Sequence, residues 1–490
     1  MKYDIIIVGA GIGGLITGNL LQKQGYDVLI LEKNDYPGGY YANFNRGDFR
    51  FDVNLHWTCG CEKGGVLYEI LKKFNGEKSV EFIKLPFLFH WIDQHNNIHF
   101  RAPTTISYYI TNMIKTFPEE AANIQEFFQT FGNLTDPNVL DRLSKMQVSQ
   151  IMGNIKNQNL KNLLEAPLGY FEWPPNDISG LFFAGFSMTH FSQGAYYIKG
   201  GAGSFSSALA KIFKENGGNI KYGLEAIKLK YREEIADGIV ARDKEGNERD
   251  FYAKIIILNN NPTTIISRSL NGNQKLKEYT SSLEKRIPSW SAVNLYLGLN
   301  IDLKEKGITD YMIWTPHNRN NSKEDLRRAF ENVNYSELPI GSIAIYSNID
   351  PTCCPKGKSI VSIYCPAIIE PFRKFSDNKE EYLSLKKRIS DDILEIVSKI
   401  LKIPDLKKYI EVLELATPLT FAKYSNEING AVMGWQMTTE QFVLNPISPK
   451  TPISNLFLSG QWASRTGGSP AIAQTADLLS GLINRYLSHK

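Results

Sequence analysis

The segment YDIIIVGAGIGGLITGNLLQKQGYDVLILE, residues 3–32, decides the fold of this 490-residue chain. Its start, residues 3–8, is a short run rich in β-branched side chains, which is typical of a buried parallel strand. Residues 15–24 carry apolar side chains at helical spacing and are followed by Gly25, and residues 27–31 form a second apolar run. The segment therefore predicts a strand, a helix and a second strand, with a glycine-rich turn before the helix.

The glycine-rich turn has the spacing G-x-G-x-x-G at Gly9, Gly11 and Gly14, with Gly13 inside it. Gly9 allows the tight turn, Gly11 lets backbone N–H groups approach a pyrophosphate, and Gly14 lets the helix pack closely on the strand. The helix N-terminus adds partial positive charge for the phosphates. Glu32 ends the second strand, where a carboxylate accepts hydrogen bonds from ribose hydroxyls. The unit predicts a bound dinucleotide and leaves FAD and NAD open.

The apolar start of the chain raises the alternative of a secretory signal or a membrane anchor. Lys2 is followed at once by Tyr3 and Asp4, and no small-residue cleavage site appears. Asn19 and Gln22 interrupt the apolar run before it reaches the roughly 20 residues of a membrane-spanning helix. We therefore expect neither feature, and the odd number of cysteines favours the reducing cytoplasm.

Composition narrows the classes of partner. The net charge is +4 and no basic stripe with interleaved aromatic residues is present, so we expect no nucleic-acid partner. Weak peripheral contact with an anionic membrane surface stays open. The five cysteines predict no disulfide framework. Cys59 and Cys61 lack the spacing of a zinc site, so we expect no metal and interpret them as small residues in a buried loop.

A second glycine pair, Gly38-Gly39, follows Glu32-Lys33, and residues 41–57 then read YANFNRGDFRFDVNLHW. The alternation of Phe with polar residues on both sides of Gly47 predicts a hairpin. This combination resembles the FAD-dependent phytoene desaturase, carotenoid isomerase and retinol saturase family of the flavin amine oxidase-like superfamily. The resemblance implies that the backbone around Lys33, Gly38 and Gly39 runs along the diphosphate and ribityl chain of FAD.

Two further segments carry the same resemblance. Residues 197–220 pair YIKGGAGS with a helix that ends at a second glycine pair, and the next strand would place the backbone of Ala226 against the adenine. Residues 456–470 read LFLSGQWASRTGGSP and precede a helix to about residue 487. The resemblance implies that Gly460, Gln461, Gly468 and Ser469 approach the flavin, with the helix N-terminus facing its pyrimidine ring. Residues 430–435 resemble a segment of the carotenoid isomerase and retinol saturase branch.

The sequence departs from the family pattern at three positions. Tyr40 stands where the family often has Arg after the glycine pair, and we still place it in the cofactor site. Asn54 stands where the family has Gly, which affects the shape near the flavin ring. Gln461 replaces an Asp or Glu, and its amide can bond a ribityl hydroxyl without charge.

We predict an α/β protein in which a Rossmann-like FAD-binding domain is interleaved with an α+β substrate domain. The FAD-binding domain comprises residues 1–65, 195–285 and 426–490, and the substrate domain comprises residues 66–194 and 286–425. Residues 66–193 are predicted to be helical except for strands within 84–101. Residues 286–425 are predicted to combine strands at 290–299, 342–347 and 359–365 with one long helix over 379–400.

Few polar candidates for catalysis stand out. His56 is the best candidate near the flavin by resemblance, and the alternative is a structural histidine with satisfied hydrogen bonds. His190 and Gln193 are weaker candidates. The apolar stretch at residues 181–186 predicts either the lining of a hydrophobic tunnel or an ordinary buried helix, and the sequence leaves both open.

The resemblance implies an FAD-dependent oxidoreductase that desaturates, saturates or isomerises C–C bonds of an apolar, conjugated or isoprenoid substrate. Because one dinucleotide fingerprint is present, electrons would be exchanged with an external quinone, O₂ or reductase. The first alternative is a flavin amine oxidase-like enzyme that acts on C–N bonds. The second is a non-catalytic prenyl-protein carrier of the same fold, although such carriers tend to lose the glycines that are intact here.

Overall fold

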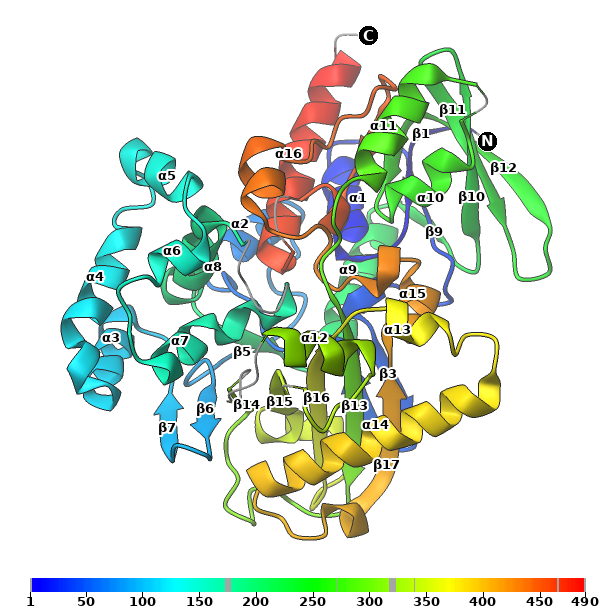
Figure 1. The fold of residues 1–490 in the computed structure, drawn as a ribbon. Helices are drawn as coiled ribbons and strands as arrows, with labels where there is room; N and C mark the ends of the chain where they lie inside the picture. The colour runs from blue at the N-terminus through cyan, green and yellow to red at the C-terminus, as the bar shows by residue number, and fades with distance from the viewer. Residues whose placement is uncertain are drawn as a thin grey trace.

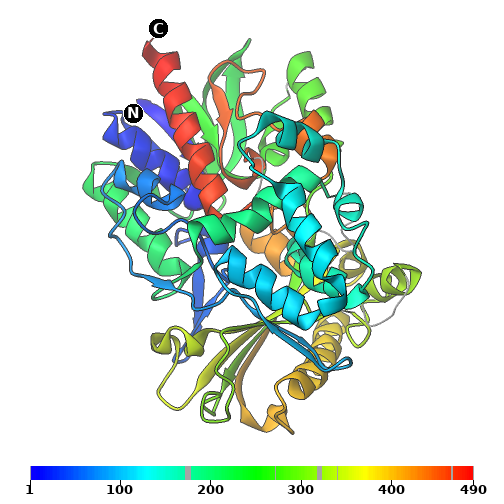
Figure 2. The same cartoon turned by 90° about the vertical axis from the view of Figure 1, so that its left-hand side faces the viewer.

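The computed structural model describes residues 2–171, 178–270, 272–316, 323–338, 340–464 and 467–488. Two seven-stranded sheets organise this part of the chain, one at the top and one at the bottom of Figure 1, with a group of helices to one side of them. Turning the molecule by 90° brings that helical group to the front, between the two sheets (Figure 2).

The first sheet has the order β10-β11-β12-β1-β2-β9, and β18 pairs with β12. Its parallel strands are β1 (Lys2–Val8), β2 (Val28–Leu31), β9 (Asn219–Lys221), β12 (Glu248–Leu258) and β18 (Leu456–Leu458). The antiparallel strands β10 (Glu225–Arg232) and β11 (Ile235–Arg242) extend it beyond β12. The Rossmann-like unit predicted from residues 3–32 is confirmed.

Both faces of the first sheet are covered, which explains why its central strand is apolar throughout. Ile5 and Ile7 of β1 pack in the cluster that contains α1 (Ile12–Lys23), whereas Ile6 and Val8 pack with α10 (Pro262–Ser267) and α11 (Gln274–Glu284) on the other face. Helix α1 contacts both α9 (Ala202–Glu215) and α16 (Ser469–Ser488), so segments from three regions of the chain lie side by side.

The second sheet has the order β17-β13-β16-β15-β14-β6-β7. Its strands are β6 (His90–Asp93), β7 (Ile98–Arg101), β13 (Ser291–Leu299), β14 (Met312–Trp314), β15 (Ser342–Ile345), β16 (Ser359–Ala367) and β17 (Ile410–Ala416). Helix α14 (Lys379–Ile400) covers one face of this sheet. Alternate residues of β13 show this clearly, because Val293 and Leu295 pack with α14 while Tyr296 points into the core on the opposite face.

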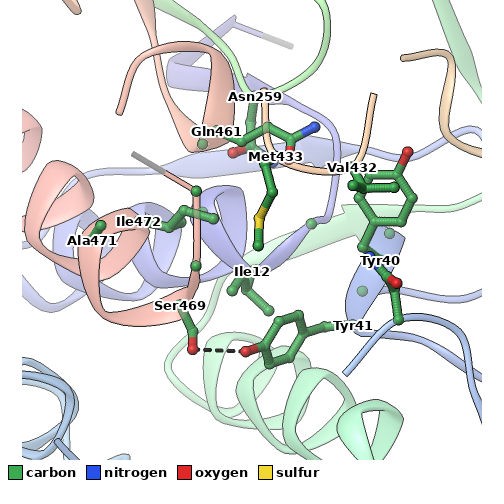
Figure 3. A pocket seen from close by; sticks show the side chains of 18 of the residues that line it. Ile12, Tyr40, Tyr41, Asn259, Val432, Met433, Gln461, Ser469, Ala471 and Ile472 are labelled. Atoms are coloured by element: carbon green, nitrogen blue, oxygen red, sulfur yellow. Dashed lines mark hydrogen bonds between the residues drawn. The ribbon is translucent and has the colours of Figure 1, made fainter. Parts of the chain in front are cut away.

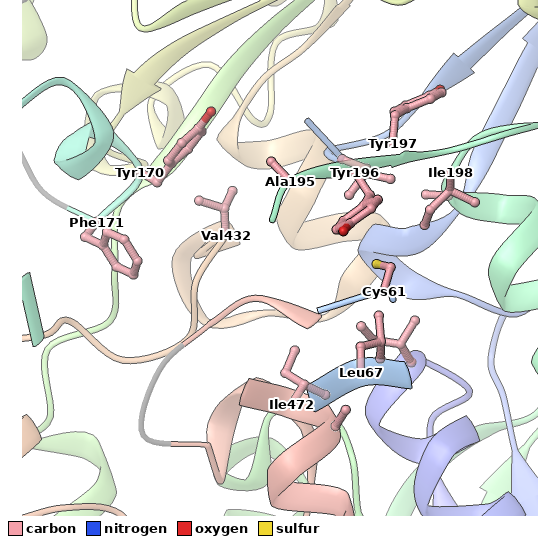
Figure 4. Close-up of a cluster of buried hydrophobic side chains, with 14 of the residues drawn as sticks. Cys61, Leu67, Tyr170, Phe171, Ala195, Tyr196, Tyr197, Ile198, Val432 and Ile472 are labelled. Carbon is pink, nitrogen blue, oxygen red and sulfur yellow. The ribbon is translucent and has the colours of Figure 1, made fainter. Parts of the chain in front are cut away.

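The remaining helices form the group beside the sheets. They are α2 (Val66–Lys72), α3 (Ile106–Thr116), α4 (Ala121–Phe131), α5 (Pro137–Ser144), α6 (Val148–Ile151), α7 (Gln158–Glu165) and α8 (Gly180–Gln193). Short strands β5 (Phe82–Lys84) and β8 (Tyr196–Ile198) pair beside them. Figure 4 shows β8, α2 and α16 contributing Tyr197, Leu67 and Ile472 to one continuous core.

The predicted hairpin is confirmed as β3 (Asn43–Arg46) and β4 (Phe49–Asp52), with Gly47 at positive φ in its turn. The hairpin docks on the start of α9. Asp52 accepts hydrogen bonds from the Ala202 N–H (2.6 Å) and the Tyr197 hydroxyl (2.5 Å). At Gly201 a Cβ would come within 2.5 Å of the Asn43 amide, so this close approach requires glycine. The contact explains why the motif at residues 197–204 and the hairpin segment belong together.

The prediction for residues 286–425 was incomplete. The long helix is confirmed with the predicted bounds, and the three predicted strands are present as β13, β15 and β16. The structure adds strands β14 and β17 and the shorter helices α12 (Lys323–Glu331), α13 (Glu370–Arg373) and α15 (Pro418–Ser425). Most of these elements are short, and β17 lies at a sheet edge with half-exposed side chains, so local patterns identify them poorly. Helix α12 does carry apolar residues at helical spacing, a signal that the sequence analysis did not use.

The strands of the first sheet fall within residues 1–65, 195–285 and 426–490, and those of the second within 66–194 and 286–425. This distribution supports the proposed domain division, whose boundaries stay a prediction. Among the residues that the structure describes, no helix combines the length and apolarity needed to cross a membrane.

Candidate functional site

A cavity of about 580 Å³ lies where the first sheet, the hairpin segment, α8 and the start of α16 meet. All predicted cofactor residues except Gly14 line it, as do His56, His190 and Gln193. The lining cofactor residues are Gly9, Gly11, Gly13, Glu32, Lys33, Gly38, Gly39, Tyr40, Ala226, Gly460, Gln461, Gly468 and Ser469. The fold thus gathers residues from three distant segments into one site, and the contacts they make with a cofactor stay a prediction.

The glycines at the start of α1 form one wall of the cavity. Gly11 is the N-cap of α1, and no side chain caps this helix end. The second glycine pair lies directly against it, because Gly11 and Gly38 form a parallel bridge and the Gly38 N–H donates to the Ala10 carbonyl at 2.8 Å. This wall offers backbone N–H groups and the positive end of a helix, which suits phosphate oxygens.

Gly14 has a different role from its neighbours. A Cβ on Gly14 would lie 2.2 Å from the Gly9 carbonyl oxygen, so this residue packs α1 onto the turn and does not face the cavity. A Cβ on Gly11 would meet nothing closer than the Asn259 amide at 3.2 Å. The structure therefore separates a packing glycine from a glycine that faces the cavity.

Glu32 is fixed at the end of β2 and is 6% exposed. One carboxylate oxygen accepts from the Ala10 N–H (2.8 Å) and the other from the Asn34 N–H (2.8 Å). Burial raises the pKa of Glu32, and these two hydrogen bonds counteract the shift. The carboxylate is thus preorganised at the cavity wall, as the ribose-binding prediction requires.

Lys33 lines the cavity, but its ammonium group is bound by the protein. It donates to the Lys423 carbonyl and to Asn426 Oδ1, both at 2.9 Å, at the C-terminal end of α15. Burial lowers its pKa, and the charges of nearby acids, led by Glu32, partly offset that effect. Lys33 therefore joins the segment after β2 to α15.

The opposite wall is built around the start of α16. The Tyr41 hydroxyl donates to Ser469 Oγ at 2.7 Å (Figure 3). Thr58 Oγ1 lies 2.6 Å from the same oxygen. Gly468 has φ of +96° and open space where a side chain would be. Pro470 occupies the first turn of α16, where proline is well tolerated. This helix end also presents backbone toward the cavity.

His56 is buried and paired with Tyr170, which the sequence analysis did not identify. His56 Nδ1 lies 2.5 Å from the Tyr170 hydroxyl, and both residues line the cavity. The Tyr311 hydroxyl donates to the His56 carbonyl, which holds its backbone in place. Burial lowers the pKa of His56 to about 4 and raises that of Tyr170, so both are neutral at pH 7.

Sequence reasoning also missed Glu427, Asn259 and Asn260. Glu427 lines the cavity, accepts from the Trp462 indole N–H, and has its pKa raised by burial to about 8. The side-chain oxygens of Asn54, Asn259 and Asn260 are buried at the cavity without a hydrogen-bond partner. The pattern Asn259-Asn260-Asn261 after a buried strand was the signal that could have pointed to them.

Helix α8 contributes the apolar wall of the cavity through Leu181, Phe182 and Phe186. The tunnel and buried-helix interpretations of residues 181–186 are thus both partly right, because the same helix also buries Phe183 and Ala184. At Gly185 of α8 there is open space, because a Cβ built on this residue would meet no atom within 4 Å.

The structure agrees with the interpretation of Cys59 and Cys61 as residues in a buried loop. Cys59 and Cys61 are free and buried, and burial raises the pKa of the Cys59 thiol to about 12. Such thiols are poor nucleophiles and ligands. Within the described ranges, no group of three or more His, Cys, Asp or Glu side chains could hold a metal ion.

Comparison with known proteins places the site in context. Residues 7–74 match the family model described as NAD(P)-binding Rossmann-like domain. The chain is 25% identical to an all-trans-retinol 13,14-reductase of Danio rerio over 99% of its own length and 86% of the relative. It is 24% identical to prolycopene isomerase 2 of an Oncidium hybrid cultivar, over 96% of this chain and 82% of that protein. It is 23% identical to a 4,4'-diapophytoene desaturase of Methylomonas sp, over 98% of this chain and 95% of that protein.

Solved structures show the same fold. An oxidoreductase from Methanosarcina mazei superposes with a TM-score of 0.66 at 17% identity, over 98% of this chain and 99% of that one. Cyclohexylamine oxidase from Brevibacterium oxydans superposes with a TM-score of 0.65 at 14% identity, over 100% of both chains. The resemblance predicted from the motifs and the predicted fold class are therefore confirmed.

Proposed function

We propose that this protein is an FAD-dependent oxidoreductase that acts on C–C bonds of an apolar polyene or isoprenoid substrate by desaturation, saturation or cis/trans isomerisation. The observation that carries the proposal is the single cavity that joins the glycine wall to the apolar wall of α8. The relatives named as a retinol reductase, a prolycopene isomerase and a diapophytoene desaturase support the substrate class.

The residues present fit FAD. The glycine wall and Glu32 suit the adenosine diphosphate half, and the unpartnered oxygens of Asn54, Asn259 and Asn260 supply acceptors for further hydroxyl or ring N–H groups. The second glycine pair against α1 favours FAD over NAD. When bound, FAD would supply hydride chemistry. The residues that would hold it are Gly9, Gly11, Gly13, Glu32, Gly38, Gly39, Tyr40, Ala226, Gly460, Gln461, Gly468 and Ser469.

The protein's own contribution would be orientation and exclusion of water. His56 and Tyr170 are neutral at pH 7, so this pair would orient a bound group through hydrogen bonds without placing a charge beside it. The apolar side of α8 would bind the hydrocarbon and keep the site dry. An external electron acceptor or donor, such as a quinone, O₂ or a reductase, completes the proposal for desaturation or saturation.

The test begins with the visible spectrum of the purified protein. A yellow protein with flavin absorption supports the proposal, and a colourless protein that cannot be reconstituted with FAD supports a carrier. The flavin is then photoreduced without oxygen, and polyenes and amines are screened for those that oxidise the reduced form or reduce the oxidised form. Reduction by amines, with no response to any polyene, would support C–N chemistry and contradict the proposal.

A further inference from the structure

A second, smaller cavity of about 40 Å³ lies behind α8. Its lining is almost entirely aromatic and aliphatic, with Ser187 and His190 as the polar members among the described residues. The lining residues are Trp57, Leu88, Phe89, Tyr109, Phe127, Phe128, Phe131, Leu164, Pro167, Phe183, Phe186, Ser187, His190 and Phe191. An apolar cavity of this kind stays dry.

Helix α8 separates the two cavities. Phe182, Gly185 and Thr189 line the main cavity, whereas Phe183 and Ser187 line the small one. This division follows from the helical repeat, because residues three and four apart share a face. Helix α8 is therefore a wall with a different cavity on each side.

Three residues line both cavities: Trp57, Phe186 and His190. We call them the aromatic partition. The rings of Phe186 and His190 meet edge to face at 5.2 Å, and those of Trp57 and His190 at 5.6 Å. The partition consists of side chains, so joining the two cavities would require these side chains to change rotamer. It is also uncharged at pH 7, since burial lowers the pKa of His190 to about 4.

The size of the small cavity limits what can enter it. A cavity of about 150 Å³ accommodates a benzene ring. At about 40 Å³ the small cavity has about a quarter of that volume, which suits one or two methyl groups at the end of a chain. A ring at the chain end would be too large.

We propose that the small cavity receives the acyclic end of the substrate, and that the aromatic partition admits such an end and excludes a ring. This inference rests on the proposed function, because it assumes that an apolar chain occupies the main cavity. It makes α8 the element that selects substrates by their end group.

The test compares lycopene, whose ends are acyclic, with β-carotene, whose ends are rings. Each polyene is titrated into the flavin-loaded protein, binding is followed by quenching of tryptophan fluorescence, and flavin content is measured by absorbance. Wild-type protein should bind lycopene at least tenfold more tightly than β-carotene. Ser187→Leu, which fills the small cavity, should abolish this preference by weakening lycopene binding while flavin content is unchanged.

Thr189→Leu is the matched control, because it adds the same side chain on the opposite side of α8. It should weaken both polyenes by similar factors. Phe128→Ala enlarges the small cavity from the side of α4 and should improve β-carotene binding. Equal binding of both polyenes to wild-type protein, or a preference that survives in Ser187→Leu, would overturn the inference alone. If neither polyene binds, the inference and the proposed substrate class fail together.

Discussion

The two glycines Gly11 and Gly14 offer a sharp test, since the structure assigns them different tasks within one motif. In Gly14→Ala, the new Cβ would lie 2.2 Å from the Gly9 carbonyl oxygen, which belongs to the turn itself. Alanine in a helix interior is about 1 kcal/mol better than glycine, and overpacking a core costs about 1–3 kcal/mol. Because a backbone atom obstructs the Cβ, we take the upper end and expect a net loss of about 2 kcal/mol in the free energy of unfolding.

Gly11→Ala should act on the cofactor instead. Gly11 has φ of −64° and ψ of 167°, which alanine adopts without strain, and its Cβ would meet only a side-chain amide at 3.2 Å. Glycine is preferred to alanine at an N-cap by about 1 kcal/mol, and alanine in a compatible conformation recovers about 0.4–1 kcal/mol by restricting the unfolded chain. We therefore expect the unfolding free energy of the cofactor-free protein to change by less than about 1 kcal/mol. The Cβ would enter the path of the pyrophosphate, so FAD affinity should fall at least tenfold, and Gly11→Val should abolish flavin retention.

The assay has two arms. Urea unfolding of the cofactor-free proteins compares stability, and titration with FAD, read from flavin absorbance and fluorescence, compares affinity. The variants should separate, with Gly14→Ala less stable and Gly11→Ala poor in flavin binding. Full flavin occupancy in Gly11→Val, or wild-type stability in Gly14→Ala, would refute the reasoning.

Three further predictions concern groups at the cavity. The pKa of Glu427 is raised from 4.5 to about 8, so its contribution to stability is present below pH 4.5 and is lost as pH rises to 8. Relative to Glu427→Gln, the wild-type unfolding free energy should fall by about 1.4 kcal/mol per pH unit across that window. Urea unfolding at several pH values measures this difference. The pKa of His190 is lowered from 6.5 to about 4, so relative to His190→Phe the wild-type unfolding free energy should fall by about 1.4 kcal/mol per unit as pH drops from 6.5 to 4. Gly185→Ala places a Cβ in open space on α8 and should raise the unfolding free energy by about 0.5–1 kcal/mol, which is measured as a higher midpoint of thermal unfolding. A lower midpoint would contradict the finding that no atom lies within 4 Å of this Cβ.

Local patterns were enough to predict several elements. The strand, turn and helix at residues 3–32 follow from spacing within a few residues, as does the hairpin around Gly47. The bounds of α14 follow from its amphipathic repeat. In each case residues close together in the sequence supply the hydrogen bonds or share the buried face, so the pattern can be recognised from the sequence alone.

The cofactor residues form an intermediate case. The strand–helix–strand unit predicted Glu32 at a dinucleotide site, and the resemblance added Gly38 and Gln461. The structure brings all three to one cavity. Spacing alone could not show that the Lys33 ammonium is bound at the end of α15, since its partners lie some 390 residues away along the chain.

The sequence by itself determined the dinucleotide-binding unit and the class of fold, because those depend on short-range backbone geometry. Only the tertiary structure decided that Tyr170 pairs with His56, that Glu427 lies at the cavity, and that α8 divides two cavities. The sequence of a helix that is apolar on all sides, such as α8, does not indicate which of its faces borders a cavity. Long-range packing alone determines which side chains line a cavity and which fill the core.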